Sequence, residues 1–396
     1  MPQSASRNNG LTLRLPTAAG ELADYTIRNA PLDLPARAGT MNRVAYAAAH
    51  VVIDPLADNN PWEDRAVDWD TTIAFREHVW GLGLAVAEAM DTAQRGMGLD
   101  WGGAQELIRR SQAAADARDG AVIAHGAGTD HLVPGPDVTI DQVIGAYEEQ
   151  VGFVEGLGGR VILMASRALA RAARSPDDYL RVYDRILSQV RSPVIIHWLG
   201  DMFDPALAGY WGSGSLDAAM ETALAVINGH ADKVDGVKIS LLDKDKEIAM
   251  RRRLAPKVKM YTGDDFNYAE LIAGDAQGHS HALLGIFDAI APAASAALTK
   301  LAAGDRVAYD ALLAPTVPLS RHIFKAPTRY YKTGVVFLGW LNGFQDHFLM
   351  LGGQQSARSL SHFAELFRLA DAARVLRDPG LAVHRMRQLL AIAGVE

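Results

Sequence analysis

The sequence has no cysteine among its 396 residues, and this absence removes several classes of chemistry at once. Disulfide bonds, thiolate nucleophiles and zinc–thiolate sites all require cysteine, so none of them can be part of this protein. Any nucleophilic or acid–base chemistry must therefore come from lysine, histidine, hydroxyl or carboxylate side chains.

The sequence also lacks long apolar runs and blocks of charge. The most apolar stretch covers residues 334–341, which is too short to span a bilayer. The first seven residues contain no apolar core of a signal peptide. The net charge of −7 comes from interleaved acids and bases, and the one basic cluster, at 251–253, is typical of a solvated helix face. We expect a cytoplasmic protein that binds neither nucleic acid nor membranes.

The composition that remains, 49% hydrophobic and 21% charged with 36 glycines, is that of a globular protein with one large domain. Residues 1–40 differ from the rest of the chain. Apolar and polar residues alternate there at 11–15 and again at 25–27, after a turn around Gly20. This pattern predicts a half-buried hairpin in an N-terminal extension.

A repeating pattern of short aliphatic runs begins after this extension. Runs of this kind are expected of parallel strands that are covered on both faces. Their starts are roughly 22 to 40 residues apart, which leaves room for one helix in each gap. The eight runs lie near residues 44–53, 83–90, 121–126, 160–166, 193–198, 233–239, 257–262 and 279–285.

Eight strand–helix units over residues 41–305 match the size of a (β/α)8 TIM barrel, which is the predicted fold. A doubly wound open sheet is the alternative, although the first strand lacks the glycine-rich dinucleotide turn. The sequence at 175–178, Ser-Pro-Asp-Asp, predicts a helix start with a hydroxyl cap. Residues 306–396 contain amphipathic helical patterns at 359–377 and 381–392, which predict a C-terminal helical block.

The active site of such a barrel lies at the C-terminal ends of its strands, so the last residues of each run are the first candidates. Most of these positions carry polar or titratable side chains. They are His50, Glu88, Asp91, His125, Ser166, His197, Lys238, residues 262–265, His279 and His281.

Lys238 is the most informative of these candidates. Strand alternation places Val237 and Ile239 on one face, and Lys238 with Gly236 on the other. If the apolar pair faces the helices, Lys238 points into the barrel, where burial lowers the pKa of its amine and frees it to attack a carbonyl. The spacing alone allows a second interpretation, a lysine at a strand end paired with a carboxylate such as Asp265.

The residues around Lys238 resemble a known family. The stretch at 236–238 reads Gly-Val-Lys, and the next expected strand reads Tyr-Thr-Gly-Asp-Asp at 261–265. Segments at 67–70, 193–196 and 291–294 also fit. Together they resemble the dihydrodipicolinate synthase / N-acetylneuraminate lyase superfamily, whose Schiff-base lysine lies in a Gly-Ile/Val-Lys strand and precedes a Ser-Gly-Asp-Asp-type strand end.

The resemblance covers roughly residues 42–305. It implies that Lys238 is the Schiff-base lysine, with Gly263 and Asp264 beside it on the next strand, where they help to bind substrate. The fifth strand of the family ends in a catalytic tyrosine, and His197 stands at that position here.

A second departure concerns the loop after the second strand, which in the family reads Gly-Thr-Thr-Gly-Glu and binds the carboxylate of a 2-oxo acid. Here residues 88–92 read Glu-Ala-Met-Asp-Thr, in which Thr92 remains. The departure indicates an outlying branch of the family. Its substrate would be a sugar-derived carbonyl compound whose polar groups meet Glu88, Asp91 and histidines such as His125.

The resemblance implies a class I lyase, an aldolase or a dehydratase, acting on a small 2-oxo acid or related sugar derivative. No cofactor is needed, because the imine on Lys238 is the electron sink. His197 would move protons as a phenol would, although a histidine hydrogen-bonded at a strand end is an equally open interpretation. The resemblance also implies a homo-oligomer, a dimer or a tetramer.

Two rival hypotheses remain. In the first, histidines ring the barrel mouth and bind a divalent metal with Asp91 or Glu88, as in a hydrolase or isomerase, and Lys238 is only a charge partner. In the second, the protein binds small molecules without catalysis. The histidines of the metal hypothesis are His50, His125, His197, His279 and His281.

Overall fold

The computed structural model describes residues 10–34 and 39–395, and the predicted strands close into a barrel. All neighbouring strands are parallel, and the last strand pairs with the first. The (β/α)8 barrel predicted from the eight aliphatic runs is therefore confirmed. Its strands are β3 (Ala45–Ala48), β4 (Ala85–Glu88), β5 (Ile123–Ala127), β6 (Arg160–Leu163), β7 (Val194–Leu199), β8 (Val234–Ser240), β9 (Lys259–Thr262) and β10 (His281–Leu284).

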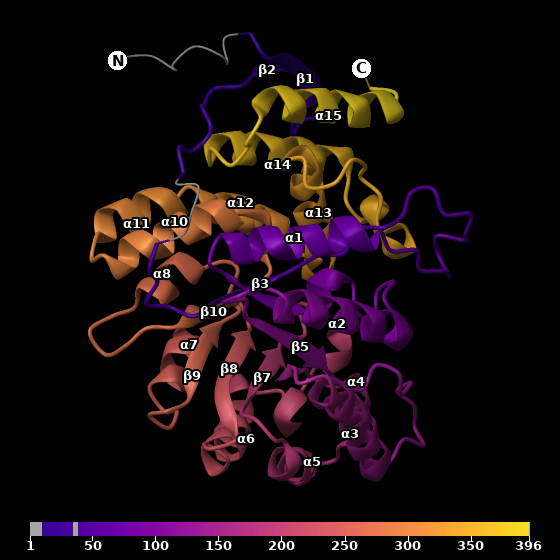
Figure 1. Ribbon diagram of the computed structural model, residues 1–396, viewed down its shortest axis with the longest axis vertical. Helices are drawn as coiled ribbons and strands as arrows, with labels where there is room; N and C mark the ends of the chain where they lie inside the picture. The colour runs from indigo at the N-terminus through magenta and orange to yellow at the C-terminus, as the bar shows by residue number, and fades with distance from the viewer. Residues whose placement is uncertain (1–9, 35–38, 396) are drawn as a thin grey trace.

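Helices between the strands form the outer layer of the barrel (Figure 1). Helix α5 begins at Pro176 as predicted, but the Ser175 side chain makes no capping hydrogen bond, so the predicted hydroxyl cap is wrong. The helices are α1 (Trp69–Gly81), α2 (Trp101–Asp116), α3 (Ile140–Gly156), α4 (Arg167–Ala172), α5 (Pro176–Gln189), α6 (Leu216–Gly229), α7 (Lys244–Arg251), α8 (Tyr268–Ala273), α9 (Ile286–Ala289) and α10 (Ala291–Ala302).

The strand residues separate into two apolar clusters, as the alternation of side chains requires. The larger cluster lies between the strands and the helices, and the smaller one fills the barrel interior. This packed interior leaves the C-terminal ends of the strands as the place for a site. The larger side chains of the inner cluster are Tyr46, Met90, Ile162, Met164, Ile195, Tyr261 and Leu283.

A C-terminal block of helices lies across the barrel at the upper end of Figure 1, in orange and yellow. Every residue of its central helix α13 is buried, and α13 packs against α9, α14, α15 and the short helix η1 (Asp91–Ala93) that follows β4. The block consists of α11 (Arg306–Leu313), α12 (Thr316–Ile323), α13 (Tyr331–Leu341), α14 (Leu360–Ala372) and α15 (Pro379–Ile392).

The predicted N-terminal hairpin is present as β1 (Thr12–Pro16) and β2 (Leu22–Thr26). It packs on α14 and α15, and the Tyr25 hydroxyl donates to the Asp371 carboxylate at 2.6 Å. Residues 1–9 and 35–38 of the predicted extension, with the stretch inspected for a signal peptide, lie outside the described residues. In the described part of the chain, no helix has both the length and the apolarity needed to cross a membrane.

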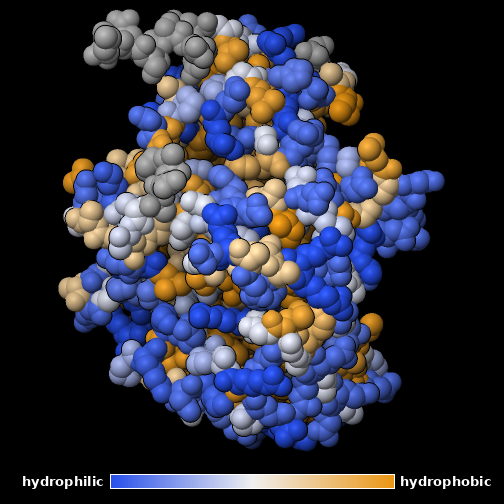
Figure 2. Space-filling model, viewed as in Figure 1, coloured by the Kyte–Doolittle hydropathy of each residue, from blue (hydrophilic) through white to orange (hydrophobic). Residues whose placement is uncertain are grey.

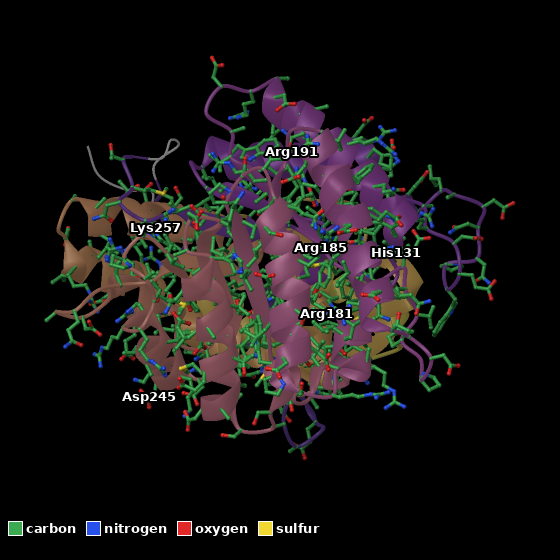
Figure 3. All side chains as sticks on the ribbon, turned by 90° about the horizontal axis from the view of Figure 1, so that it is seen from below. His131, Arg181, Arg185, Arg191, Asp245 and Lys257 are labelled. Carbon is green, nitrogen blue, oxygen red and sulfur yellow. The ribbon has the colours of Figure 1, made fainter. Side chains whose placement is uncertain are left out.

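The outer surface carries charges of both signs. The face in Figure 2 is mostly hydrophilic with scattered apolar patches. In Figure 3, Arg181 and Arg185 lie along α5, and they pair with Asp141 and Glu148 of α3 at 2.6 and 2.9 Å. Such exposed pairs contribute at most about 1 kcal/mol each to stability. The helix layer is therefore held mainly by its apolar contacts with the strands.

One ion pair is completely buried between the barrel and its helices. Arg76 of α1 binds the Glu88 carboxylate of β4 through Nε and Nη2, at 2.8 and 2.9 Å. Ser111 of α2 donates to the same carboxylate at 2.6 Å. Both charged side chains are fully excluded from solvent, so each depends on the other to replace its lost hydration.

We predict that Glu88→Gln lowers the free energy of unfolding by about 3–5 kcal/mol, because it leaves the buried Arg76 guanidinium without a counter-charge. Urea unfolding followed by circular dichroism measures the change. Glu106→Gln is the matched control, because its pairs with Arg109 and Arg110 on α2 are exposed and should contribute less than about 1 kcal/mol. Equal effects of the two substitutions would contradict this account of the buried pair.

Candidate active site

Lys238 points into the barrel from β8. Val237 and Ile239 belong to the outer cluster, so the alternation turns Lys238 inward. Two glycines make room for it: a Cβ at Gly263 would lie 2.8 Å from Lys238 Cε, and one at Gly236 would lie 2.5 Å from the Tyr261 ring. A side chain larger than hydrogen at either position would fill the space that the lysine and the ring now occupy.

The Lys238 ammonium lies inside the barrel, and no described side chain contacts it in a direct ion pair. The residue is 8% exposed, and among the described residues its amine makes no hydrogen bond or ion pair. Burial lowers the pKa of Lys238, while the nearby carboxylates of Asp265 and Asp91 act in the opposite direction. The amine is therefore uncharged at a lower pH than an ordinary lysine, which is the state that attacks a carbonyl.

Asp265 is the carboxylate that faces Lys238, at the start of the loop after β9. It accepts a hydrogen bond from the Ile286 N–H at 2.9 Å. Burial raises the pKa of Asp265, whereas this hydrogen bond and the charge on Lys238 lower it. The charges of the two side chains act on each other, as the second interpretation of Lys238 expects, but no direct ion pair joins them among the described residues.

His197 lies beside Lys238 on β7, where the two residues are partners in the strand register. Its Nε2 atom is 3.2 Å from Ser240 Oγ, one inward position further along β8. Burial lowers the pKa of His197 well below its ordinary value, and the charge on Lys238 lowers it further. The imidazole is therefore neutral at pH 7 and can accept a proton from a bound group.

A pocket with a cavity volume of about 80 Å³ opens from solvent to His197. Its walls come from the loops after β4 to β7, which are the C-terminal ends of the strands. The lining residues that matter below are Asp91, Met164, Arg167, His197, Leu199 and Asp204.

Helix α13 of the C-terminal block adds two buried residues to this mouth, Tyr331 and Lys332. The Tyr331 hydroxyl and Thr92 Oγ1 are 2.8 Å apart, and the Tyr331 ring stacks on Phe324 with centroids 4.4 Å apart. Burial and then the Asp91 charge raise the pKa of Tyr331 well above its ordinary value, so it stays protonated. Reasoning from strand ends could not find these residues, because they lie outside the barrel sequence.

Several predicted site residues do come together. Lys238 and His197 are register partners, Asp91 lines the pocket and acts electrostatically on Lys238, and Gly263 borders the lysine chain. Thr92 lies at the mouth, where its hydroxyl is bonded to that of Tyr331. These positions come from β4, β7, β8 and β9, whose ends converge in the barrel.

Asp264 was expected to contact substrate, but its carboxylate is engaged in its own turn. It accepts hydrogen bonds from the backbone N–H groups of Phe266 and Asn267 at 2.9 and 3.0 Å, and from Asn267 Nδ2 at 2.8 Å. These hydrogen bonds give Asp264 a structural role in its loop, and its contact with substrate stays a prediction. Asp264 shapes the loop, and Asp265 faces the lysine.

Glu88 and His125 were also expected to bind substrate, and both expectations are wrong. Glu88 is held outside the barrel by Arg76, and His125 Nε2 is 2.8 Å from Gln112 Oε1 on α2. The two residues are partners in the β4–β5 register, so the alternation turns both toward the helices. The inward positions are their neighbours, such as Ala87.

The histidines that the metal hypothesis places around the barrel mouth do not lie together. His50 is buried with Asp288, 2.7 Å from Nδ1 to Oδ2, and His125 points outward. His281 begins β10 and accepts from the Val44 N–H at 2.9 Å, and its ring lies 5.4 Å from that of His279. Across residues 10–34 and 39–395, no three histidine, aspartate or glutamate side chains form a group that could hold a metal ion. The histidines therefore occupy separate places in the barrel.

Solved structures with the same fold are members of the dihydrodipicolinate synthase family. YagE, a prophage protein of that family from E. coli K12 in complex with pyruvate, has a TM-score of 0.64 at 14% identity, covering 85% of this chain and 99% of that one. The dihydrodipicolinate synthases of Oceanobacillus iheyensis and Acinetobacter baumannii, the latter complexed with pyruvate, give TM-scores of 0.61 and 0.59 at 14% and 17% identity. They cover 83% and 84% of this chain and 95% and 98% of their own. The resemblance predicted from the residues around Lys238 is confirmed for the fold.

The comparison with curated proteins gives no match. A family model does match, over residues 13–395, and its description is "Protein of unknown function (DUF993)". The match includes the hairpin and the C-terminal helices as well as the barrel. The chain therefore belongs to the DUF993 family, whose barrel here has the fold of the dihydrodipicolinate synthases.

Proposed function

We propose that this protein is a Schiff-base (class I) lyase, an aldolase or a dehydratase, acting on a 2-oxo acid or a sugar-derived carbonyl compound. The observation that carries the proposal is Lys238: a buried amine inside the barrel that forms no direct ion pair among the described residues and is the register partner of His197, which lines a pocket. The two structural neighbours solved with pyruvate support it, since both contain a small 2-oxo acid.

The chemistry begins at Lys238 Nζ. The neutral amine adds to the substrate carbonyl carbon, and the carbinolamine loses its oxygen as water to give a protonated imine. This imine accepts the electron pair released when a carbon–carbon bond breaks, or when a proton leaves the neighbouring carbon before a hydroxyl is lost as water. Either route gives an enamine, which takes up a proton at carbon after carbon–carbon cleavage or expels the hydroxyl as water in the dehydration. Hydrolysis of the resulting imine then releases the product and restores the amine.

His197 is placed to move the protons of these steps. It is the register partner of Lys238, and its neutral imidazole accepts a proton that the imidazolium can later return. Asp265 and Asp91 balance the positive charge of the imine. Thr92 and Tyr331, joined by their hydroxyl hydrogen bond, orient the substrate at the opposite side of the mouth.

We predict that borohydride reduction of the full-length protein with a reactive keto acid leaves a stable adduct on Lys238. Pyruvate and a panel of larger keto acids and keto sugars are the probes, and peptide mass spectrometry locates the adduct. Lys238→Ala should remove it. Lys257→Ala is the matched control, because Lys257 is an exposed lysine at the edge of the molecule (Figure 3). The lyase proposal fails if no compound of the panel is trapped.

We also predict that Asp265→Asn moves imine formation to lower pH. The Asp265 charge raises the pKa of Lys238, so its removal lowers that pKa further and keeps the amine neutral in more acidic solution. The yield of trapped adduct at short times is measured across a series of pH values. The fall in yield on the acidic side should occur at a lower pH in Asp265→Asn than in the wild-type protein. The same pH for this fall in a folded variant would show that Asp265 does not act on the lysine.

A further inference from the structure

A second hollow continues from the pocket toward the C-terminal block. It is narrow, with a cavity volume of about 10 Å³, and it shares five lining residues with the pocket, Asp91, Arg95, Arg167, Leu199 and Asp204. The remaining walls include Met97, Phe203, Arg329, Tyr331 and Lys332. The two hollows therefore adjoin, with His197 at one side and Tyr331 and Lys332 of α13 at the other.

Lys332 is the unusual residue of this hollow. It is 2% exposed, and its ammonium contacts the Met97 sulfur at 3.1 Å and lies 5.2 Å from the centre of the Tyr331 ring. Among the described residues no carboxylate forms an ion pair with it. A thioether and a ring face replace little of the hydration that a buried ammonium loses. An anion bound next to Lys332 would therefore be stabilised by its charge.

The other cationic side chains of the hollow differ in how far they are free to bind an anion. Arg95 is neutralised by Asp130, which it binds through Nε and Nη2 at 2.8 and 2.7 Å. Arg167 binds Asp204 through Nε, but its side chain remains 41% exposed, so the rest of its guanidinium fork is accessible. Arg329 lies at the open side, above the Tyr330 ring.

The charge balance of the space favours an anionic ligand. Four cationic residues line the second hollow, against the two carboxylates of Asp91 and Asp204. Burial lowers the pKa of Lys332 to about 8, with Arg167 adding to the effect and Asp91 and Asp204 opposing it. Lys332 therefore keeps its proton at pH 7, and binds an anion there rather than acting as a second nucleophile.

We propose that Lys332 and Arg167 form a subsite for an anionic group, a carboxylate or a phosphate, on the substrate whose carbonyl reaches Lys238. The identity of that substrate rests on the proposed function, but anion binding itself does not require the imine. The proposal narrows the substrate class, because neutral keto sugars would leave the Lys332 ammonium unpaired in the closed complex. Carbonyl compounds with a carboxylate or phosphate are the substrates that fit.

Calorimetric titration of the full-length protein with inorganic phosphate, and separately with malonate, tests the subsite. The wild-type protein should bind at least one of the two anions, and the one that binds more tightly identifies the chemistry. Lys332→Met should weaken this binding at least ten-fold, and Arg167→Gln should weaken it several-fold. Lys257→Met, at the exposed lysine labelled in Figure 3, should bind like the wild-type protein.

Asp204→Asn gives a test that a folding defect cannot imitate. The amide keeps the oxygen that accepts from the Ala206 N–H, but it removes a negative charge and releases Arg167, so anion binding should become several-fold tighter. Lys238→Ala should still bind the anion although it cannot form the imine, which separates this proposal from the proposed function. Binding of neither anion, or equal binding by wild type and Lys332→Met, would overturn the subsite.

Discussion

A lysine ammonium inside a closed barrel has lost most of its water, and the geometry of this site follows from how that loss is compensated. Lys238 has carboxylates nearby, Asp265 and Asp91, but no ion pair with either among the described residues. A direct ion pair would hold the amine in its charged form, whereas partial compensation leaves the pKa of Lys238 below that of an ordinary lysine. Burial, and then the charge on Lys238, also lower the pKa of the neighbouring His197. The burial of both side chains in the barrel therefore favours the neutral form of each.

The sequence was sufficient for the fold because parallel barrel strands are covered on both faces and appear as uninterrupted aliphatic runs. It was also sufficient for Lys238, since Val237 and Ile239 mark the outer face of β8. In β4 no such mark exists: small apolar residues occupy both faces, so nothing in the pattern shows that Glu88 points outward. The strand-end rule locates a position along the barrel axis, but it does not determine the face.

The residues that α13 adds to the candidate site could not be predicted from the sequence, for a different reason. Its sequence is an apolar helix outside the barrel, and its only local peculiarity is a lysine, Lys332, among residues that are all buried. Only tertiary packing brings its first turn over η1, where Tyr331 meets Thr92. A buried lysine in an apolar helix can be recognised in sequence, but the residues around it, which follow β4, β6 and β7, cannot.

If the proposals hold, the chain combines a Schiff-base lysine on β8 with an anion-binding lysine on α13. The chemistry at Lys238 requires only an inward amine and space beside it, and both are set by β8 and by Gly263 on β9. Proton transfer and anion recognition require particular charges at particular positions, but they do not require a particular strand. A neutral imidazole on β7 and an ammonium on α13 meet those requirements. The barrel can keep its fold at 14% identity, because different residues can pack the same strands and helices while the side chains at the strand ends change.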